Sequence, residues 1–124
     1  EITCMPSQIK HALLNIVKNA AQAMASKKYA APDAPSLFIK TSENNGSAEI
    51  IIEDNGIGMD IDVKRRIFEP FYTTHEVGEG TGLGLFVSYS IITEKHSGSI
   101  SVDSLKGKFT RFTIKLPIEH PGKI

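Results

Sequence analysis

The segment Ser47-Ala-Glu-Ile-Ile-Ile-Glu-Asp54-Asn-Gly56-Ile-Gly58 predicts a β-strand that ends in a glycine-rich turn. Because side chains alternate along a strand, Asp54 lies on the same face as Ile50 and Ile52 and continues an apolar row. A carboxylate in that place is partly buried and needs hydrogen-bond donors, since an unpaired buried charge is costly. The alternative is a plain turn, in which Asp54 bonds to its own backbone.

Further strands and helices are predicted on both sides of this segment. The other strands cover residues 36–43, 99–104 and 109–117, and Asn44-Asn45-Gly46 is a hairpin signal between the first two strands of the chain. The helices cover residues 6–26, 60–67 and 83–95, with Asp60 or Asp62 as the cap of the second. Helices packed on one face of a largely antiparallel sheet make an α+β fold, a two-layer sandwich.

The composition fits one soluble globular domain over residues 1–124. The formal net charge is zero, so a nucleic-acid binder, which would show a basic face, is not expected. Cys4 is the only cysteine, which excludes an intrachain disulfide and favours a reducing compartment, the cytoplasm. No apolar run approaches the ~18 residues of a membrane span, and no direct membrane contact is expected. Because the first residue is Glu1, we expect a fragment of a larger protein.

Two asparagines lie one turn apart on the first predicted helix. Asn15, Asn19 and Gln22 fall within about 60° of one another around the helix axis. The apolar stripe on the other side consists of Ile9, Leu13, Ile16, Val17, Ala20 and Met24. Asparagine inside a helix runs against its propensity. The alternatives are a solvated helix face and a pair of amide oxygens aimed at one point.

A glycine-rich loop, Gly78-Glu-Gly80-Thr-Gly82-Leu-Gly84-Leu85, runs into the last predicted helix. Glycines let backbone amides approach a phosphate, and a helix N-terminus adds unpaired N–H groups and partial positive charge. The loop has no Gly-Lys-[Ser/Thr] end, and its glycine spacing does not fit the dinucleotide or protein-kinase loops. The alternatives are a phosphate cradle, with residues 73–82 as a lid, and a flexible connection that binds nothing.

Four short motifs follow one another along the chain. They are Asn15-Ile-Val-Lys-Asn19, Asp54-Asn-Gly56-Ile-Gly58, Phe68-Glu-Pro70-Phe71 and Gly80-Thr-Gly82-Leu-Gly84-Leu85. In this order and spacing, residues 5–117 resemble the ATP-binding catalytic domain of sensor histidine kinases, whose superfamily includes type II topoisomerases, Hsp90-type chaperones and mismatch-repair ATPases. The resemblance implies a Bergerat-type two-layer α/β sandwich, with about three helices on one face of a mixed, largely antiparallel five-stranded sheet.

The resemblance also implies roles for the matching residues. Asp54 would accept a hydrogen bond from the adenine amino group, whereas guanine presents a carbonyl there, so ATP is expected over GTP. Asn19 would give its amide oxygen to Mg²⁺, and Asn15 would support the ion through water or contact the phosphates. Met59 would pack on the adenine or, alternatively, in the core. The implied nucleotide-binding set is Asn15, Asn19, Gln22, Asp54, Gly56, Gly58, Met59, Phe68, Gly80, Thr81, Gly82, Leu83, Gly84, Leu85 and Thr110, with Asn19 as the metal ligand.

By this resemblance the chain binds Mg-ATP and donates the γ-phosphoryl group to a histidine on a separate dimerisation domain of the same parent protein, as in two-component signalling. None of His11, His75, His96 and His120 fits the phosphoacceptor, and His96 is expected to be structural. No catalytic residue is therefore assigned within the chain, and the isolated domain, expected to be monomeric, should show little turnover. A response-regulator receiver domain is the expected downstream partner, and the parent can be membrane-anchored.

One departure from the superfamily's hydrolases favours a kinase. They place a glutamate at the position of Asn15, where it acts as general base for water, and an amide cannot take that proton. The alternatives are a hydrolytic conformational ATPase, a degenerate nucleotide-sensing or partner-docking module, and a serine kinase of the anti-sigma type.

Two positions also depart from the kinases. Lys108 stands where a glycine is common between Gly107 and Thr110. Gln22 stands where some members carry a phosphate-binding lysine. Lys18, Lys27 or a residue of 73–82 would then supply that charge, unless Mg²⁺ alone suffices.

Overall fold

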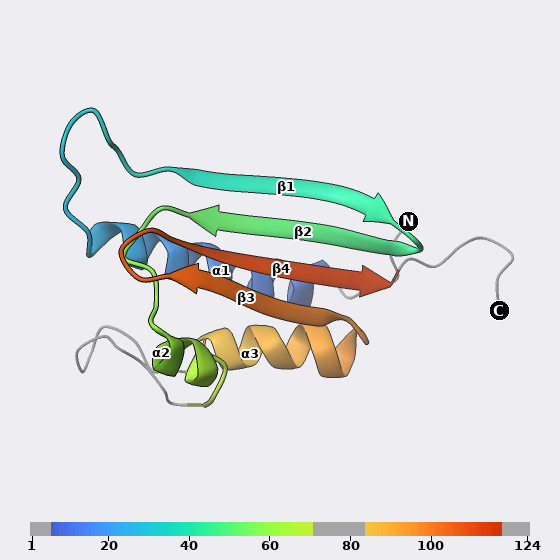
Figure 1. The fold of residues 1–124 in the computed structure, drawn as a ribbon. Coiled ribbons are helices and arrows are strands. Elements are labelled where there is room, and N and C mark those ends of the chain that lie inside the picture. The colour runs from blue at the N-terminus through green and yellow to red at the C-terminus, as the bar shows by residue number, and fades with distance from the viewer. Residues whose placement is uncertain (1–5, 71–83, 118–124) are drawn as a thin grey trace, which may run out of the picture.

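The structure is a computed structural model that describes residues 6–70 and 84–117. In chain order its elements are α1 (Pro6–Ala25), β1 (Leu37–Asn44), β2 (Ser47–Asp54), α2 (Ile61–Arg66), α3 (Gly84–Ser90), the π-helical turn η1 (Ile91–Lys95) that continues α3, β3 (Ser99–Leu105) and β4 (Phe109–Pro117). Figure 1 shows them as one sheet with the helices packed beside it. None of the described helices is both long enough and apolar enough to cross a membrane.

The described strands form one antiparallel sheet in the order β1-β2-β4-β3. β2, which ends at Asp54, is therefore an inner strand between β1 and β4 (Figure 1). The hairpin between β1 and β2 turns through Asn45 and Gly46, whose φ angles are 50° and 80°. Positive φ at both central residues is the geometry that the Asn44-Asn45-Gly46 signal predicts.

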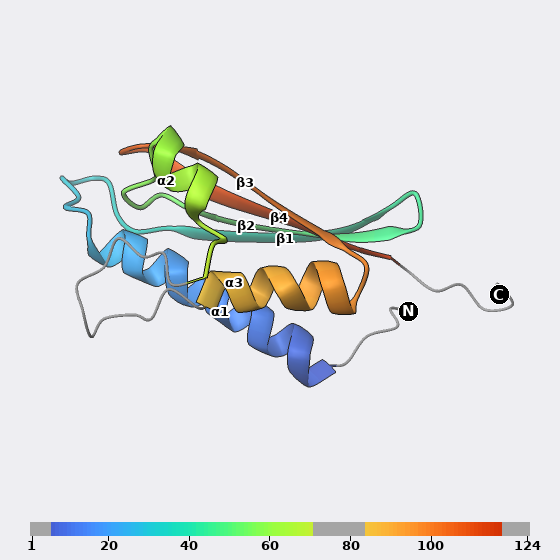
Figure 2. The same cartoon turned by 90° about the horizontal axis from the view of Figure 1, so that it is seen from below.

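The core lies between the sheet and two helical segments. Figure 2 shows α1 and α3 on the same side of the sheet. The buried apolar side chains are Ile52, Ile100, Phe112, Ile114 and Leu116 from the strands and Ala12, Ile16, Ile91 and Ile92 from the helical segments. The predicted stripe on α1 thus faces the sheet, and removing these side chains from water stabilises the two-layer arrangement.

The predicted fold class, a two-layer α+β sandwich, is confirmed, but the predicted mixed sheet of five strands is wrong for the part of the chain that is described. The sheet there has four strands, and every pairing is antiparallel. The longest described connection, residues 26–36, contains Pro32 and Pro35. Because proline lacks the N–H that a ladder requires, this connection does not add a strand.

The helix predicted over residues 83–95 differs at its end. Regular α-helix stops at Ser90, and η1 forms the last turn. Nδ1 of His96 lies 2.8 Å from the carbonyl oxygen of Ile91, and the Gly98 N–H donates to the carbonyl of Ile92 at 2.8 Å. These groups take up carbonyls that a helix end leaves open. His96 is buried, so its predicted structural role is confirmed.

The cap of α2 is Asp60, which decides between the two predicted candidates. Its Oδ1 accepts a hydrogen bond from the Val63 N–H at 2.9 Å, and the helix begins at Ile61. A side-chain oxygen that satisfies an N–H of the first turn is the usual device for starting a helix.

Candidate functional site

A row of polar side chains crosses the inward face of the sheet at one end. Asp54 on β2 pairs with Thr110 on β4, and Thr110 pairs with Ser104 on β3. All three side chains are buried, and Asp54 and Thr110 are each 2% exposed. Their neighbours in the same sheet face, such as Ile52 and Phe112, belong to the apolar core. Buried polar groups that continue an apolar face need a chemical reason, since their desolvation is costly.

Ser104 organises this row through three hydrogen bonds. Its hydroxyl donates to the carbonyl of Phe109 at 2.6 Å and accepts from the Met59 N–H at 2.8 Å. Its Oγ also lies 3.0 Å from Oγ1 of Thr110. Because a serine hydroxyl has one proton, and Phe109 receives it, Thr110 is the donor in this last bond. The oxygen of Thr110 then keeps its capacity to accept a hydrogen bond.

The Asp54 carboxylate is held by the glycine turn that follows it. The Gly56 N–H donates to Oδ1 of Asp54 at 2.8 Å. The bond expected of a plain turn is therefore present, but it forms in a buried setting. Burial raises the pKa of the Asp54 carboxyl above its ordinary value; the bond from Gly56 opposes the shift and the neighbouring charge of Glu53 adds to it. A ligand amino group can meet the second carboxylate oxygen and replace part of the lost hydration.

The loop 55–58 is packed so closely against neighbouring backbone that its two glycines leave no room for a Cβ atom. A Cβ built on Gly56 would lie 2.6 Å from the carbonyl carbon of Ala23, and one built on Gly58 would lie 2.1 Å from the carbonyl oxygen of Leu105. The Ile57 N–H donates to the carbonyl of Ala23 at 3.1 Å. The loop thus lies against the last turn of α1 on one side and the β3–β4 turn on the other.

The asparagine helix and the start of α3 are brought together. A Cβ built on Gly84 would lie 3.7 Å from Oδ1 and Cγ of Asn15, an ordinary van der Waals distance. Asn19 is half-buried on the same helix, four residues before Ala23, which contacts the glycine loop. One helical turn advances about 5.4 Å, so Asn19 lies one turn before the residue that contacts the loop after Asp54. Gln22, also half-buried on α1, lies between Asn19 and Ala23 in the sequence.

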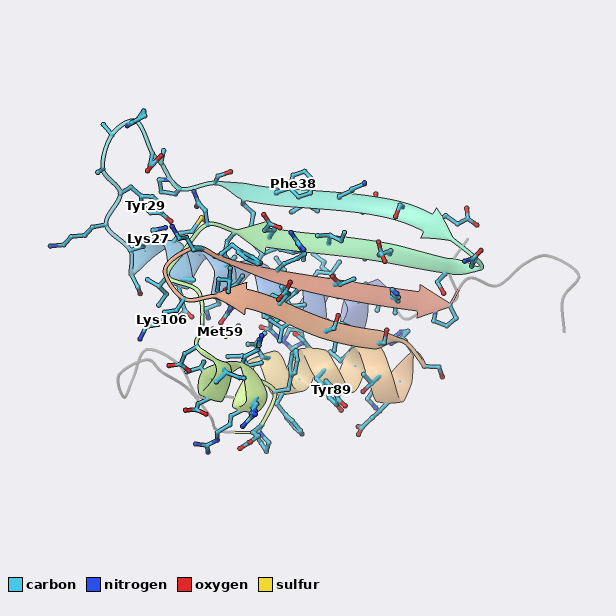
Figure 3. All side chains as sticks on the ribbon, viewed as in Figure 1. Lys27, Tyr29, Phe38, Met59, Tyr89 and Lys106 are labelled. Atoms are coloured by element: carbon cyan, nitrogen blue, oxygen red, sulfur yellow. The ribbon has the colours of Figure 1, made fainter. Side chains whose placement is uncertain are left out.

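Phe68 packs against aromatic side chains of the core. Its ring centre lies 5.3 Å from that of Tyr89 on α3 and 6.1 Å from that of Phe112 on β4. Leu85 also packs against the core cluster. Met59 is half-buried and its N–H donates to Ser104 on β3; Figure 3 labels it between the β3–β4 hairpin and α2. Phe68 therefore anchors the segment after α2, while Met59 lies beside the polar row.

Some predicted site residues fall outside the described ranges, so their roles stay predictions. They are Gly80, Thr81, Gly82 and Leu83 of the glycine-rich loop, together with Phe71 and the suggested lid over residues 73–82. Among the residues the structure does describe, no group of three or more His, Cys, Asp or Glu side chains could hold a metal ion.

Sequence reasoning missed Ser104 and the contacts that Lys27 makes around the glycine loop. Ser104 could have been found, because the period of two places it on the inward face of β3 with Ile100 and Val102. Lys27 was a candidate for a phosphate contact, but its ammonium bonds to the carbonyls of Asn55 and Gly107. No local sequence pattern predicts these two bonds, since Asn55 and Gly107 lie far from Lys27 along the chain.

Comparison with known proteins agrees with this arrangement. Residues 4–120 match the profile of the family described as histidine kinase-, DNA gyrase B-, and HSP90-like ATPase. The chain is 45% identical over 120 residues to sporulation kinase E of Bacillus subtilis, covering 96% of this chain and 15% of that protein. It is 38% identical over 123 residues to the sensor histidine kinase ZraS of Escherichia coli O157:H7, covering 99% of this chain and 25% of that protein. The chain thus spans a quarter or less of the length of these curated relatives.

Solved structures show the same fold. The catalytic domain of histidine kinase ThkA superposes with a TM-score of 0.76 at 26% identity, covering 94% of this chain and 71% of that one. The mycobacterial sensor histidine kinase MprB gives a TM-score of 0.76 at 26% identity, covering 94% and 74%. The resemblance inferred from the four motifs is confirmed, and this chain belongs to the histidine kinase-, DNA gyrase B- and HSP90-like ATPase family.

Proposed function

We propose that this domain binds Mg-ATP and donates the γ-phosphoryl group to a histidine on a separate dimerisation domain of the same parent protein, as in two-component signal transduction. The observation that carries the proposal is the buried Asp54 carboxylate, fixed by Gly56 and paired across the sheet with Thr110. A domain with no ligand to bind gains nothing from a desolvated carboxylate at the end of its core.

Recognition of the base follows from the donors and acceptors of the buried polar row, Asp54, Thr110 and Ser104. Asp54 is an acceptor when ionised, so it suits the exocyclic amino group of adenine. The carbonyl of guanine would face the carboxylate instead and leave a buried charge unpaired, which favours ATP over GTP. Thr110, whose proton goes to Ser104, would offer its oxygen to a second donor, such as a water bound to the base.

The donor chemistry of α1 fits a magnesium ion that arrives with a nucleotide. Mg²⁺ takes oxygen ligands, commonly one or two from the protein, and fills its octahedron with phosphate oxygens and water. Asn19 offers one amide oxygen from a rigid helix, one turn from Asn15. When bound, the ion would neutralise charge on the phosphates, and Asn19 would hold it at a fixed height along α1.

Asn15 is the residue that separates transfer from hydrolysis. It lies beside Gly84, at the start of α3, where the predicted phosphate-binding loop would end. An amide orients a phosphate or a water molecule but cannot accept a proton from water. The site would therefore hold ATP without activating water, and an external histidine would act as the acceptor in a reaction driven by positioning and charge stabilisation.

Partners and location follow from this reaction. The phosphohistidine would pass its phosphoryl group to a receiver domain of a response regulator. The formal net charge of zero gives no support for nucleic-acid binding. We place the domain in the cytoplasm as a monomer when isolated, with a parent that is either soluble or membrane-anchored.

The proposal is tested by combining calorimetry with two assays. We expect ATP to bind with magnesium, steady-state hydrolysis to stay at background, and phosphate to appear on a histidine-bearing dimerisation domain from a relative when the two are mixed. Fast hydrolysis without that domain would instead favour the conformational ATPase. ATP binding without either reaction, with any of several such domains, would favour the sensing module.

Asn19→Ala tests the metal site. We expect the variant to lose the tightening of ATP binding that magnesium gives to the unaltered domain, since the protein ligand to the ion is gone. Titrations with and without the ion, by calorimetry, measure the difference. His11→Ala, at an exposed position two turns earlier on α1, is the control and should keep the full magnesium effect. If magnesium tightens binding equally in Asn19→Ala, then Asn19 is not the ligand.

A further inference from the structure

Lys27, just beyond the end of α1, bonds to two loops that are distant in sequence. Its Nζ donates to the carbonyl of Asn55 at 3.2 Å and to the carbonyl of Gly107 at 3.1 Å. The Nζ also lies 5.1 Å from the ring centre of Tyr29. Figure 3 labels Lys27 and Tyr29 together at the end of the sheet where β2 finishes. One ammonium thus links α1, the glycine loop and the β3–β4 turn.

Tyr29 converges on the same carbonyl oxygen. Its hydroxyl donates to the Asn55 carbonyl at 2.8 Å and lies 3.2 Å from Oδ1 of Asn55. Partial burial, followed by the negative charge of Asp54, raises the pKa of the Tyr29 hydroxyl, so the hydroxyl keeps its proton for this bond. The side chain of Asn55 is fixed in turn, because it accepts from the Ser36 N–H and donates to the Ala34 carbonyl, each at 2.8 Å.

The carbonyl held in this way belongs to the peptide group that orients Asp54. The C=O of Asn55 and the N–H of Gly56 are parts of one planar unit and point in opposite directions. The N–H side donates to Oδ1 of Asp54 at 2.8 Å. Fixing the carbonyl side therefore fixes the direction of the N–H. A cation on the carbonyl oxygen also polarises the peptide and strengthens its N–H as a donor.

We propose that Lys27 and Tyr29 are positioning residues for purine recognition: they hold the Asn55–Gly56 peptide plane, and through it the carboxylate that meets the amino group of the base. This inference rests on the proposed function and adds to it residues that lie in none of the four motifs. Neither side chain touches the base, and both act through the peptide.

The contacts of Lys27 are suited to tuning the site more than to holding the fold. Its bond to Gly107 is exposed and its bond to Asn55 is partly buried, whereas the core lies between the sheet and the helices. A hydrogen bond at an exposed position contributes little to stability. A change in carboxylate direction, in contrast, acts directly on a ligand whose hydrogen bond requires good alignment.

The test compares two ligands that differ only in the amino group. ATP and purine riboside triphosphate, which lacks that group, are titrated into the domain with magnesium. We expect the unaltered domain to prefer ATP by about tenfold or more, the value of a hydrogen bond to a charged group. In Lys27→Met, which keeps the length of the side chain and removes the ammonium, we expect that preference to fall below about threefold. Lys28→Met, at the exposed neighbouring position, should keep the full preference.

Each outcome separates the two proposals. If the unaltered domain binds ATP but shows no preference over the analogue, the proposed role of Asp54 fails, and this inference fails with it. If the unaltered domain prefers ATP and Lys27→Met retains that preference, only the positioning role is overturned. An equal loss of affinity for both ligands in a folded Lys27→Met would also overturn it, because the preference for the amino group is then retained.

Tyr29→Phe provides the second variant and covers the case in which Lys27→Met does not fold. It removes a single hydroxyl and keeps the ring beside Lys27. We expect its preference for ATP to fall by about threefold or more, since one donor to the Asn55 carbonyl is lost. A preference equal to that of the unaltered domain, measured with the same two ligands, would contradict the role of Tyr29.

Discussion

We expect Asp54→Asn to lower the affinity for ATP by about 10- to 150-fold and to leave the domain folded. The amide keeps an oxygen that can accept from the Gly56 N–H, so the turn after β2 is preserved. The other half of the amide is a donor, and it would face the donor amino group of adenine. Calorimetry with ATP measures the loss. Asp103→Asn, which removes an exposed carboxylate from β3, is the control and should bind ATP as the unaltered domain does.

The same variant carries a prediction about pH and stability. Because burial raises the pKa of the Asp54 carboxyl above its ordinary value of 3.8, protonated Asp54 favours the folded state, and this contribution is fully present below 3.8. It is lost as the pH rises through the raised pKa, so at neutral pH the buried carboxylate lowers the stability of the unliganded domain. Asp54→Asn should therefore unfold at the same or a higher temperature at neutral pH.

Two results would contradict this account of Asp54. An unchanged affinity for ATP would remove the residue from the site. A large loss of thermal stability in the unliganded variant would show that the carboxylate is there to hold the fold. The expected combination, weaker binding with unimpaired stability, is typical of a group that is kept for function at a cost to folding.

The sheet that carries the site could be predicted from local pattern. The bounds of β2 and β4 were predicted correctly, because alternation and turn signals are strong in both segments. The position of Asp54 on the inward face followed from the same alternation, and its burial agrees. The α1 stripe was predicted because apolar residues recur with the helical period from Ile9 to Met24.

What could not be predicted depends on contacts between distant segments. The bond from Lys27 to Gly107 joins residues 80 positions apart. The sequence around either residue contains no pattern that predicts it. The π-helical turn η1 depends on how His96 and Gly98 fold back on the helix end. The strand count was overestimated because the expected five strands came from the family resemblance, whereas the described segments form four.

Gly58 is the position where we expect a substitution to cause a large loss of stability. We expect Gly58→Ala to lower the free energy of unfolding by about 3 kcal/mol or more, from a positive φ and from overpacking together. The φ angle is 67°, and a Cβ there would lie 2.1 Å from the backbone oxygen of Leu105, which cannot swing away as a side chain can. Denaturant or thermal unfolding measures the loss, and any folded fraction should bind ATP weakly because the loop after Asp54 is displaced.

Gly107→Ala separates the two causes. Gly107 also has a positive φ, 82°, but nothing lies within 4 Å of the place where its Cβ would stand. This substitution should therefore cost only the backbone term, about 1 kcal/mol. The difference between the two variants then measures the close approach of Gly58 to Leu105. Equal losses in the two variants would contradict a close contact between the glycine loop and the β3–β4 turn. They would also contradict the hydrogen bond that joins these two segments, from the Gly107 N–H to the Ile57 carbonyl at 2.5 Å.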